Sequence, residues 1–295
     1  MTQDIYIGID GGGTKSKIRV EDRAGKLLGQ AFAGPANVRL STEQAWQSIY
    51  HGLDDVLTPL AISLNDSQFR FHVGLGLAGS EVTSAAQAFI DNAHPFTTLK
   101  LVSDAHIACV SAHGLQPGAI IIIGTGVIGY QIAGAKSMRV SGWGFPHDDE
   151  GGGAWLGLEA IRVTLQWLDH RQEKSPLAED VFNFFEQDKT HLVTWANAAT
   201  STDYARLAPI VINHSQQAEA VALRIMKKAA HAIDRVGVAL EKQWQVDEST
   251  LPCCLFGGIA PFIQPLLGEA LRSRLVTRKI DPCIGAILMV RENND

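Results

Sequence analysis

The stretch IYIGIDGGGTKSKIRV, from Ile5 to Val20, joins an apolar run, an acid and three consecutive glycines. The run Ile5–Asp10 is typical of a buried strand, and the alternation over Ser16–Val20 predicts a second strand. The turn EDRAGK at residues 21–26, followed by LLGQAFA, predicts a third strand. The chain is therefore expected to begin with a β-meander that has a glycine loop between its first two strands.

The loop made of Gly11, Gly12, Gly13 and Thr14 has the composition of a phosphate site. Glycine lets the backbone approach a ligand closely, and successive backbone N–H groups form a nest for an anion. The P-loop and Rossmann patterns both need a helix after the glycines, whereas a strand-like run follows here. A hairpin without a ligand would leave the acid before the loop unexplained. We therefore expect the loop to bind nucleotide phosphates and Asp10 to hold Mg²⁺ through water.

A second strand, loop and strand unit follows in AIIIIGTGVIGYQIAG, residues 119–134, with Gly124, Thr125 and Gly126 in the loop. The two units lie about 115 residues apart, which is too far for a solenoid repeat and indicates a duplicated domain. Periodicity also predicts other elements. These are helices at Thr42–Leu57, Ala218–Trp244 and the closing DPCIGAILMV, and strands at Phe71–Gly79, Leu99–Asp104 and PCCLF.

Length and composition narrow the class of protein. With 295 residues, about two domains are expected. The net charge of −6 and the lack of a basic block disfavour nucleic acid as a partner. The four cysteines lie in apolar or helical runs, which argues against a disulfide framework. No leader-like or membrane-spanning run is evident, so we expect a cytoplasmic protein without membrane contact.

The motifs GGGT, GPAN, GLAGSE, SDAH, GTG, WGFPHDDEGGGAWLG and FGGIA occur in this order along the chain. Singly they are weak, but the ordered set resembles the N-acetylglucosamine kinase and BadF/BadG/BcrA/BcrD ATPase family, within the actin-like ATPase and sugar kinase superfamily. The resemblance covers almost the whole chain. It implies an α/β fold with two ribonuclease-H-like domains, mixed central sheets, flanking helices and a cleft between them. The implied domains are residues 1–116 with 282–295, and residues 117–281.

The same resemblance implies an activity: ATP- and Mg²⁺-dependent phosphorylation of an amino sugar at its 6-hydroxyl. N-acetylglucosamine is the expected substrate, glucosamine is the alternative, and a homodimer is a possible assembly. Asp104 would be the catalytic base, and both glycine loops would bind the ATP phosphates. Gly257 and Gly258 would lie against the adenosine. The implied sugar-binding residues are Asn37, Ser80, Asp104, Gly142, Trp143, Gly144 and Asp149.

Two acidic positions have more than one interpretation. Asp104 stands at a strand-to-helix junction, where ligands of open α/β sheets collect, but it could simply cap the next helix. In HDDEGGG, residues 147–153, consecutive acids are poorly arranged for one metal ion. Asp149 is expected to contact sugar, with His147, Asp148 and Glu150 capping the following helix or acting around a metal.

Three other functions are considered. For a glucosamine kinase, an acid such as Asp148 or Glu150 would face the cationic amine. A reductase-activating ATPase would need cysteines that hold an iron–sulfur cluster at an interface, and the positions of these cysteines do not favour one. A non-catalytic sensor would bind ATP and sugar and turn over neither.

Overall fold

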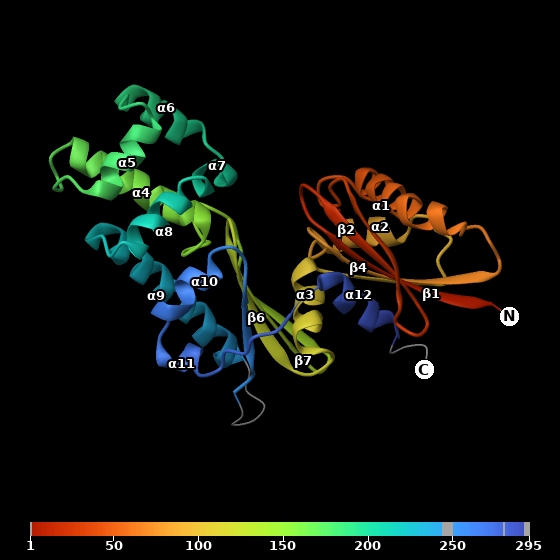
Figure 1. The fold of residues 1–295 in the computed structure, drawn as a ribbon. Coiled ribbons are helices and arrows are strands. Elements are labelled where there is room, and N and C mark those ends of the chain that lie inside the picture. The colour runs from red at the N-terminus through yellow and green to blue at the C-terminus, as the bar shows by residue number, and fades with distance from the viewer. Residues whose placement is uncertain (1, 244–249, 280, 292–295) are drawn as a thin grey trace. The chain divides into compact units, whose positions relative to one another are not determined.

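The computed structural model describes residues 2–243, 250–279 and 281–291 and divides into two compact units. Unit 1 comprises Met1–Gly118, Ile132–Ser137 and Arg278–Asp295, and unit 2 comprises Ala119–Gln131 and Met138–Thr277. Figure 1 shows strands and helices in both units. The predicted class, α/β with flanking helices, is confirmed.

Unit 1 is built on a five-stranded sheet in the order β3-β2-β1-β4-β5. The glycine-loop hairpin and the EDRAGK turn produce the predicted meander, in which β2 pairs antiparallel with β1 and β3. The strands β4 and β5 extend the sheet in parallel with β1. The strands are β1 (Gln3–Gly11), β2 (Ser16–Asp22), β3 (Leu27–Ala33), β4 (Phe69–Leu77) and β5 (Thr98–Val102).

The two faces of β1 follow from the period of two in a strand. Ile5, Ile7 and Ile9 are buried in the core that also contains apolar side chains of α1 (Thr42–Leu57). Tyr6 faces the other way and packs against Ile287 and Val290 of α12 (Pro282–Arg291). Asp10 has the parity of Tyr6 and therefore points to the face that α12 covers.

Glycines let α12 lie unusually close to the sheet. A Cβ added to Gly8 would stand 2.0 Å from the carbonyl oxygen of Cys283, and one on Gly74 would stand 2.0 Å from that of Ala286. The same closeness holds between α12 and α3 (Asp104–His113), where a Cβ on Gly285 would meet the carbonyl oxygen of Ile107. The N-terminal ends of α3 and α12 are thereby fixed on one face of the sheet (Figure 1).

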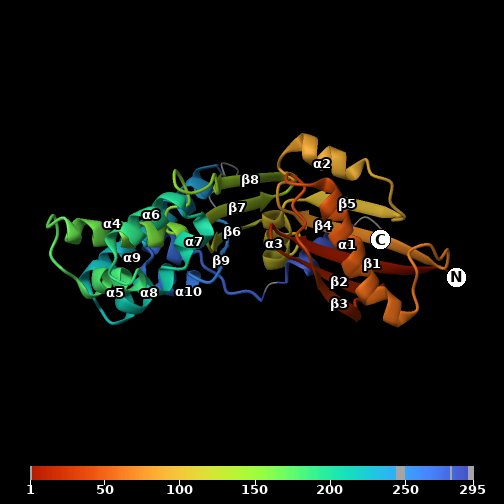
Figure 2. The same ribbon diagram turned by 90° about the horizontal axis from the view of Figure 1, so that it is seen from above.

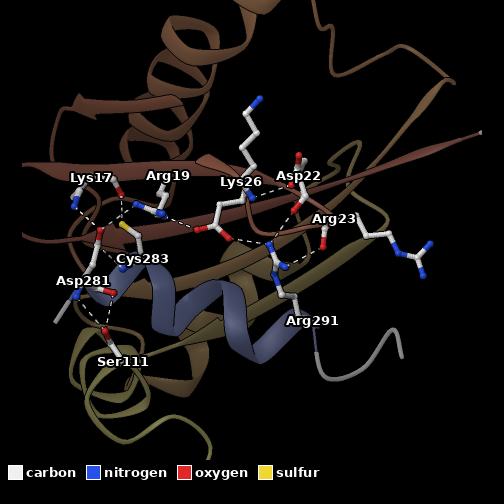
Figure 3. A network of polar contacts seen from close by, with 10 residues as sticks. Lys17, Arg19, Asp22, Arg23, Lys26, Ser111, Asp281, Cys283 and Arg291 are labelled. Carbon is white, nitrogen blue, oxygen red and sulfur yellow. Dashed lines mark hydrogen bonds and ion pairs between the residues drawn. The ribbon is translucent and has the colours of Figure 1, made fainter. Parts of the chain in front are cut away.

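A network of ion pairs joins the ends of α12 to β2 (Figure 3). At one end, the Lys17 ammonium lies 2.9 Å from the carboxylate of Asp281. At the other, Arg291 donates to the buried Glu21, 2.8 Å away, and Glu21 also accepts from Arg19. The network positions Asp281 beside the carboxyl end of β1.

Unit 2 contains a four-stranded sheet in the order β8-β7-β6-β9, in which β6 and β9 are parallel. Its strands are β6 (Gly118–Ile123), β7 (Val127–Ala133), β8 (Lys136–Ser141) and β9 (Cys253–Phe256). Figure 2 shows the helices of this unit gathered to one side of these strands. They are α4 (Gly153–Leu168), α5 (Pro176–Phe184), α6 (Lys189–Ala198), α7 (Ser201–Ala205), α8 (Ala208–Gln216), α9 (Ala220–Gln243), α10 (Ala260–Ile263) and α11 (Glu269–Arg272). Unit 2 also contains a 3₁₀ turn at Gln264–Leu266. Unit 1 contains the helix α2 (Thr83–Ile90) and a 3₁₀ turn at Thr58–Leu60.

Several predicted boundaries shift. The strand predicted at Phe71–Gly79 runs from Phe69 to Leu77, and the helix predicted from Ala218 begins at Ala220. The strand predicted at Leu99–Asp104 ends at Val102, because the Ser103 hydroxyl accepts a hydrogen bond from the backbone N–H of His106 and begins α3. The long helix predicted to reach Trp244 is described up to Gln243, and Trp244 lies outside the described residues. Among the helices described, none has the length and apolar character needed to cross a membrane.

Candidate functional site

Asp10 is the acid at the end of β1, and it lies near two other carboxylates of unit 1. Burial, and then the charges of Asp104 and Asp281, raise its pKa from 3.8 to about 6, while Lys17 and Lys15 oppose the shift. Asp104 and Asp281 stand at the N-terminal ends of α3 and α12, which pack on the face toward which Asp10 points. Three carboxylates that disfavour one another's charge would be stabilised by a cation.

The first glycine loop is anchored at its base and open at its tip. A Cβ on Gly11 would stand 2.4 Å from the Leu77 side chain, whereas a Cβ on Gly13 would meet nothing within 4 Å. Gly12 donates its backbone N–H to the Lys15 carbonyl oxygen at 3.0 Å. Gly13 and Thr14 are exposed, so they are accessible to a ligand.

Two loops of unit 1 that carry predicted sugar-binding residues hydrogen-bond to this glycine loop. Ala36 donates its N–H to the Gly12 carbonyl oxygen at 2.9 Å, and Ala78 donates to that of Gly11 at 2.8 Å. Asn37 follows the first contact and Ser80 lies two residues after the second. The structure therefore brings Asp10–Thr14, Asn37 and Ser80 together at the carboxyl ends of the parallel strands β1 and β4.

The side chains of Asn37 and Ser80 differ in what they contact. The Asn37 amide oxygen accepts from the backbone N–H groups of Arg39 and Leu40, at 3.1 and 3.3 Å, which fixes the turn. The Ser80 hydroxyl is buried and has no hydrogen-bond partner among the described residues. A buried hydroxyl of this kind is the group that a ligand would satisfy.

Asp104 is exposed at the start of α3. One of its carboxylate oxygens accepts from the Ala105 backbone N–H at 2.7 Å. Ser103, and not Asp104, is the N-cap, so the capping interpretation of Asp104 is wrong. Burial lowers the pKa of the neighbouring His106 to about 4, so this imidazole is neutral at pH 7. Asp104 thus combines exposure with a fixed orientation.

Unit 1 provides a partial environment for a metal ion. Within the described ranges, no three His, Cys, Asp or Glu side chains are grouped so that they could hold an ion by themselves. Asp10 with the open glycine loop suits Mg²⁺, because this ion keeps several waters and takes its remaining ligands from one or two carboxylates and the substrate's phosphates.

The second glycine loop joins β6 to β7 in unit 2, and two further motifs pack against it. Gly153 and Ala154, which begin α4, donate N–H groups to the carbonyl oxygens of Gly124 and Thr125, at 2.8 and 2.9 Å. Ile259 donates to the Ile123 carbonyl oxygen at 3.2 Å. The GTG, DEGGG and GGIA motifs therefore form one cluster.

A pocket of about 410 Å³ opens beside this cluster. Gly124 and Thr125 line one part of it, Gly258 and Ile259 another. The remaining wall is mostly apolar and comes from the α7–α8 region and α10: Ala205, Ala208, Pro209, Ile212, Asn213 and Phe262. A pocket with glycine-loop residues on one side and a mostly apolar wall on the other suits a purine nucleoside. Sequence reasoning missed Asn213 and the apolar wall, because short helices without a motif supply them.

Asp149 lies beneath the second glycine loop. Its carboxylate accepts from the Val127 backbone N–H at 3.2 Å, and a Cβ on Gly126 would stand 2.5 Å from that carboxylate. Burial, and then the charge of Asp148, raise the pKa of Asp149. The contacts described for Asp149 hold the loop in place, and the sugar contact predicted for it stays a prediction.

The loop Gly142–Gly144 is exposed at its centre. The Trp143 side chain is 71% exposed and lies against the Arg139 guanidinium, 4.7 Å from the ring centroid. Asp148 accepts from the Trp143 backbone N–H at 2.8 Å and from the Ser141 hydroxyl at 3.0 Å. Asp148 therefore orders this loop, and the sugar role of Gly142, Trp143 and Gly144 stays a prediction.

The acids of HDDEGGG do not cap α4. The N-cap is Gly152, no side chain caps the helix, and its first turn contains no acid. Glu150 instead forms an ion pair with Arg235 of α9. The capping role expected for His147, Asp148 and Glu150 is therefore wrong, because the helix begins beyond their reach.

All four cysteines are buried and free. They are Cys109, Cys253, Cys254 and Cys283. Burial raises the pKa of the Cys253 thiol to about 12 and that of Cys283 further still. Buried, protonated thiols of this kind are poor ligands for an iron–sulfur cluster at an interface.

Gly257 offers a sharp test of the second loop's geometry. It has φ +94°, and a Cβ there would stand 2.2 Å from the Ile123 carbonyl oxygen. We expect Gly257→Ala to destabilise the protein by about 2 kcal/mol or more in urea unfolding and to abolish nucleotide binding. The matched control is Gly258→Ala, whose added methyl would meet nothing within 4 Å and should leave stability almost unchanged. Equal stability of the two variants would contradict this account of the loop.

Comparisons with known proteins agree with this arrangement. The chain is 34% identical to the glucosamine kinase GspK of Vibrio cholerae, over 97% of this chain and 95% of that protein. It is 28% identical to an N-acetylmuramic acid/N-acetylglucosamine kinase of Clostridium acetobutylicum, over 98% and 99% of the two chains. A crystal structure of an N-acetylglucosamine kinase candidate from Chromobacterium violaceum matches with a TM-score of 0.84 at 32% identity, over 97% and 98%. The family model described as the BadF/BadG/BcrA/BcrD ATPase family matches residues 7–290, and the chain therefore belongs to that family.

Proposed function

We propose that this protein is an ATP-dependent amino-sugar kinase that phosphorylates the 6-hydroxyl of glucosamine. The observation that carries the proposal is the cluster in unit 1, where an open glycine loop, the exposed Asp104 and the unpartnered Ser80 hydroxyl gather at the ends of parallel strands. The kinase relatives, matched over nearly their full length, support the reaction class.

In the proposed reaction, Asp104 accepts the proton of the sugar hydroxyl while the hydroxyl oxygen forms a bond to the γ-phosphorus and ADP leaves. Such transfers depend mainly on positioning and on neutralising charge, so Asp104 chiefly orients the hydroxyl. Its bond from the Ala105 backbone N–H fixes one carboxylate oxygen for this task. Ser80 would bind a sugar hydroxyl, and Asn37 would hold the adjoining turn in shape.

Different groups of the protein would bind the phosphates, the adenosine and the metal ion. Backbone N–H groups at Gly13, Thr14, Thr125 and Gly126 would bind phosphate oxygens. Those of Gly12 and Gly124 donate to the carbonyl oxygens of Lys15 and Gly126 and would keep the two loops in shape. The mostly apolar pocket of unit 2 would take the adenosine, and Asn213 in its lining would offer a polar group to the base. Mg²⁺, held at Asp10 through water, would neutralise the phosphate charge. The two units are proposed to be the two domains of the actin-like architecture.

Glucosamine is proposed first because the relative with 34% identity carries that name. N-acetylglucosamine is the second candidate, supported by the 28% and 25% identical relatives. The two sugars differ by the charge of an amine and the bulk of an acetyl group, so one pocket is expected to distinguish them strongly.

The proposal is tested by a coupled ADP-release assay with ATP and Mg²⁺ and the full chain. The acceptors are glucosamine, N-acetylglucosamine, N-acetylmannosamine and glucose, with a reaction lacking sugar as the blank. We expect kcat/KM for glucosamine to exceed that for each other sugar by about tenfold or more. If N-acetylglucosamine is preferred, the proposed kinase reaction stands, and N-acetylglucosamine takes the place of glucosamine as the substrate. ADP release that ignores every sugar would overturn the kinase and favour an ATPase that drives another protein.

A further inference from the structure

Unit 2 contains a second groove whose lining is separate from that of the nucleotide pocket. It measures about 800 Å³ and is lined by residues of α9, by Glu150 in the segment that leads into α4 and by Trp155 of α4. The helices α4 and α9 contact each other; Figures 1 and 2 show both helices in unit 2. None of the residues that line it also lines the nucleotide pocket. Its size lies within the range of small-molecule sites.

Basic side chains of α9 form one wall of this groove. They recur at three- and four-residue spacing and so share one helix face: Arg224, Lys227, Lys228, His231 and Arg235. Glu150 is the one acid among the lining residues. Because the whole chain has a net charge of −6, this positive wall is a local feature that opposes the overall charge.

The positive charges of the groove are only partly neutralised. Arg235 pairs with Glu150, and the Lys228 ammonium lies 3.6 Å from a carboxylate oxygen of Glu159. Arg224 donates to the neutral amide oxygen of Gln172 at 3.3 Å. Within the part of the chain that the structure describes, Lys227 has no acidic partner. An anion in the groove would therefore meet unpaired donors as well as a charged wall.

Trp155 of α4 contributes an aromatic surface to the same groove. Its side chain is partly buried and packs against the core of unit 2, so its position is fixed. A rigid indole beside ammonium and guanidinium groups suits a ligand with both a phosphate and a ring. Bare inorganic phosphate would use only the cations.

We propose that this groove binds a phosphate monoester with a small polar ring, the chemistry of a hexose phosphate. The phosphate contacts Lys227, Lys228 and Arg235, and the ring lies against Trp155. The binding itself does not depend on the kinase activity proposed above.

The groove is also connected to the second glycine loop. An anion competes with Glu150 for Arg235, and Glu150 adjoins Asp149, whose carboxylate contacts Gly126 and the Val127 N–H.

Isothermal titration calorimetry on the full chain tests the site, with a non-hydrolysable ATP analogue and Mg²⁺ saturating the nucleotide sites. The probes are glucose 6-phosphate, inorganic phosphate and glucose. The groove variant is Lys227→Gln/Lys228→Gln, and the matched control is Lys136→Gln/Lys242→Gln, which removes two exposed positive charges outside the groove. We expect glucose 6-phosphate to bind the parent and the control equally, and the groove variant at least about tenfold more weakly.

The other probes distinguish the source of the phosphate. If inorganic phosphate binds more weakly than glucose 6-phosphate and glucose does not bind, a ring-bearing ligand is supported. Trp155→Leu should then lower the affinity for glucose 6-phosphate to that for inorganic phosphate. Equal affinity for inorganic phosphate and glucose 6-phosphate would overturn the assignment of a ring. Equal affinity of the groove variant and the parent, or no binding of either phosphate, would overturn the site.

Discussion

Asp104→Asn is expected to lower kcat for the sugar-dependent release of ADP by about 10²- to 10⁴-fold, the usual contribution of a positioned general base. The amide keeps an oxygen that can accept the Ala105 N–H bond, so the start of α3 should be unchanged. The amide cannot accept the hydroxyl proton, and KM for the sugar should change much less than kcat. Steady-state kinetics in both substrates provide the measurement.

The control for this variant is Asp55→Asn on α1, which removes an exposed carboxylate that pairs only with His51 among the described residues. It should retain the kcat of the parent. If folded Asp104→Asn also turned over at nearly the parental rate, Asp104 would not be the base. Far-ultraviolet circular dichroism and a urea transition distinguish that result from misfolding.

Asp10→Asn is expected to stabilise the ligand-free protein while it abolishes activity. The pKa of Asp10 rises from 3.8 to about 6 on folding, so the folded state binds the proton more tightly than the unfolded state. Below pH 3.8 the Asp10 carboxyl is protonated in both the folded and the unfolded state, and it does not lower the free energy of unfolding. Between pH 3.8 and about 6 the unfolded state ionises first, and stability falls as pH rises. Above about pH 6 the free energy of unfolding stays lower by the full amount, up to about 3 kcal/mol.

Urea unfolding of the parent and of Asp10→Asn at pH 4 and pH 7.5 measures this cost. The variant should gain up to about 3 kcal/mol at pH 7.5 and little at pH 4. Added ATP and Mg²⁺ should stabilise the parent more than the variant, because the variant lacks the carboxylate that would hold the metal. The same stability difference at both pH values would show that the Asp10 carboxyl does not carry the cost.

Much of unit 1 could be predicted from the sequence, because local rules decide it. The glycine loop, the alternation after Ser16 and the turn at residues 21–26 determine the meander. The helix Thr42–Leu57 has the predicted bounds, since Ser41 caps it and its apolar face has clear helical period. The gathering of Asp10, Asn37 and Ser80 follows from parallel strands that end at the same edge of one sheet.

The features that were missed depend on tertiary contacts. Asp149 lies under the second glycine loop because α4 begins at Gly153 and donates N–H groups to that loop, which no local pattern in HDDEGGG reveals. The ion pair between Glu150 and Arg235 joins residues 85 positions apart. The apolar wall of the 410 Å³ pocket comes from α7, α8 and α10, whose residues belong to no recognisable motif.

The identity of the product decides whether this protein phosphorylates the 6-hydroxyl of glucosamine. A reaction of the full chain with ATP, Mg²⁺ and glucosamine is followed by ³¹P NMR with proton correlation. We expect a phosphate monoester resonance that correlates with the two protons on C6, formed in step with ADP. Inorganic phosphate and ADP without a sugar ester, or an ester on another carbon, would contradict this expectation.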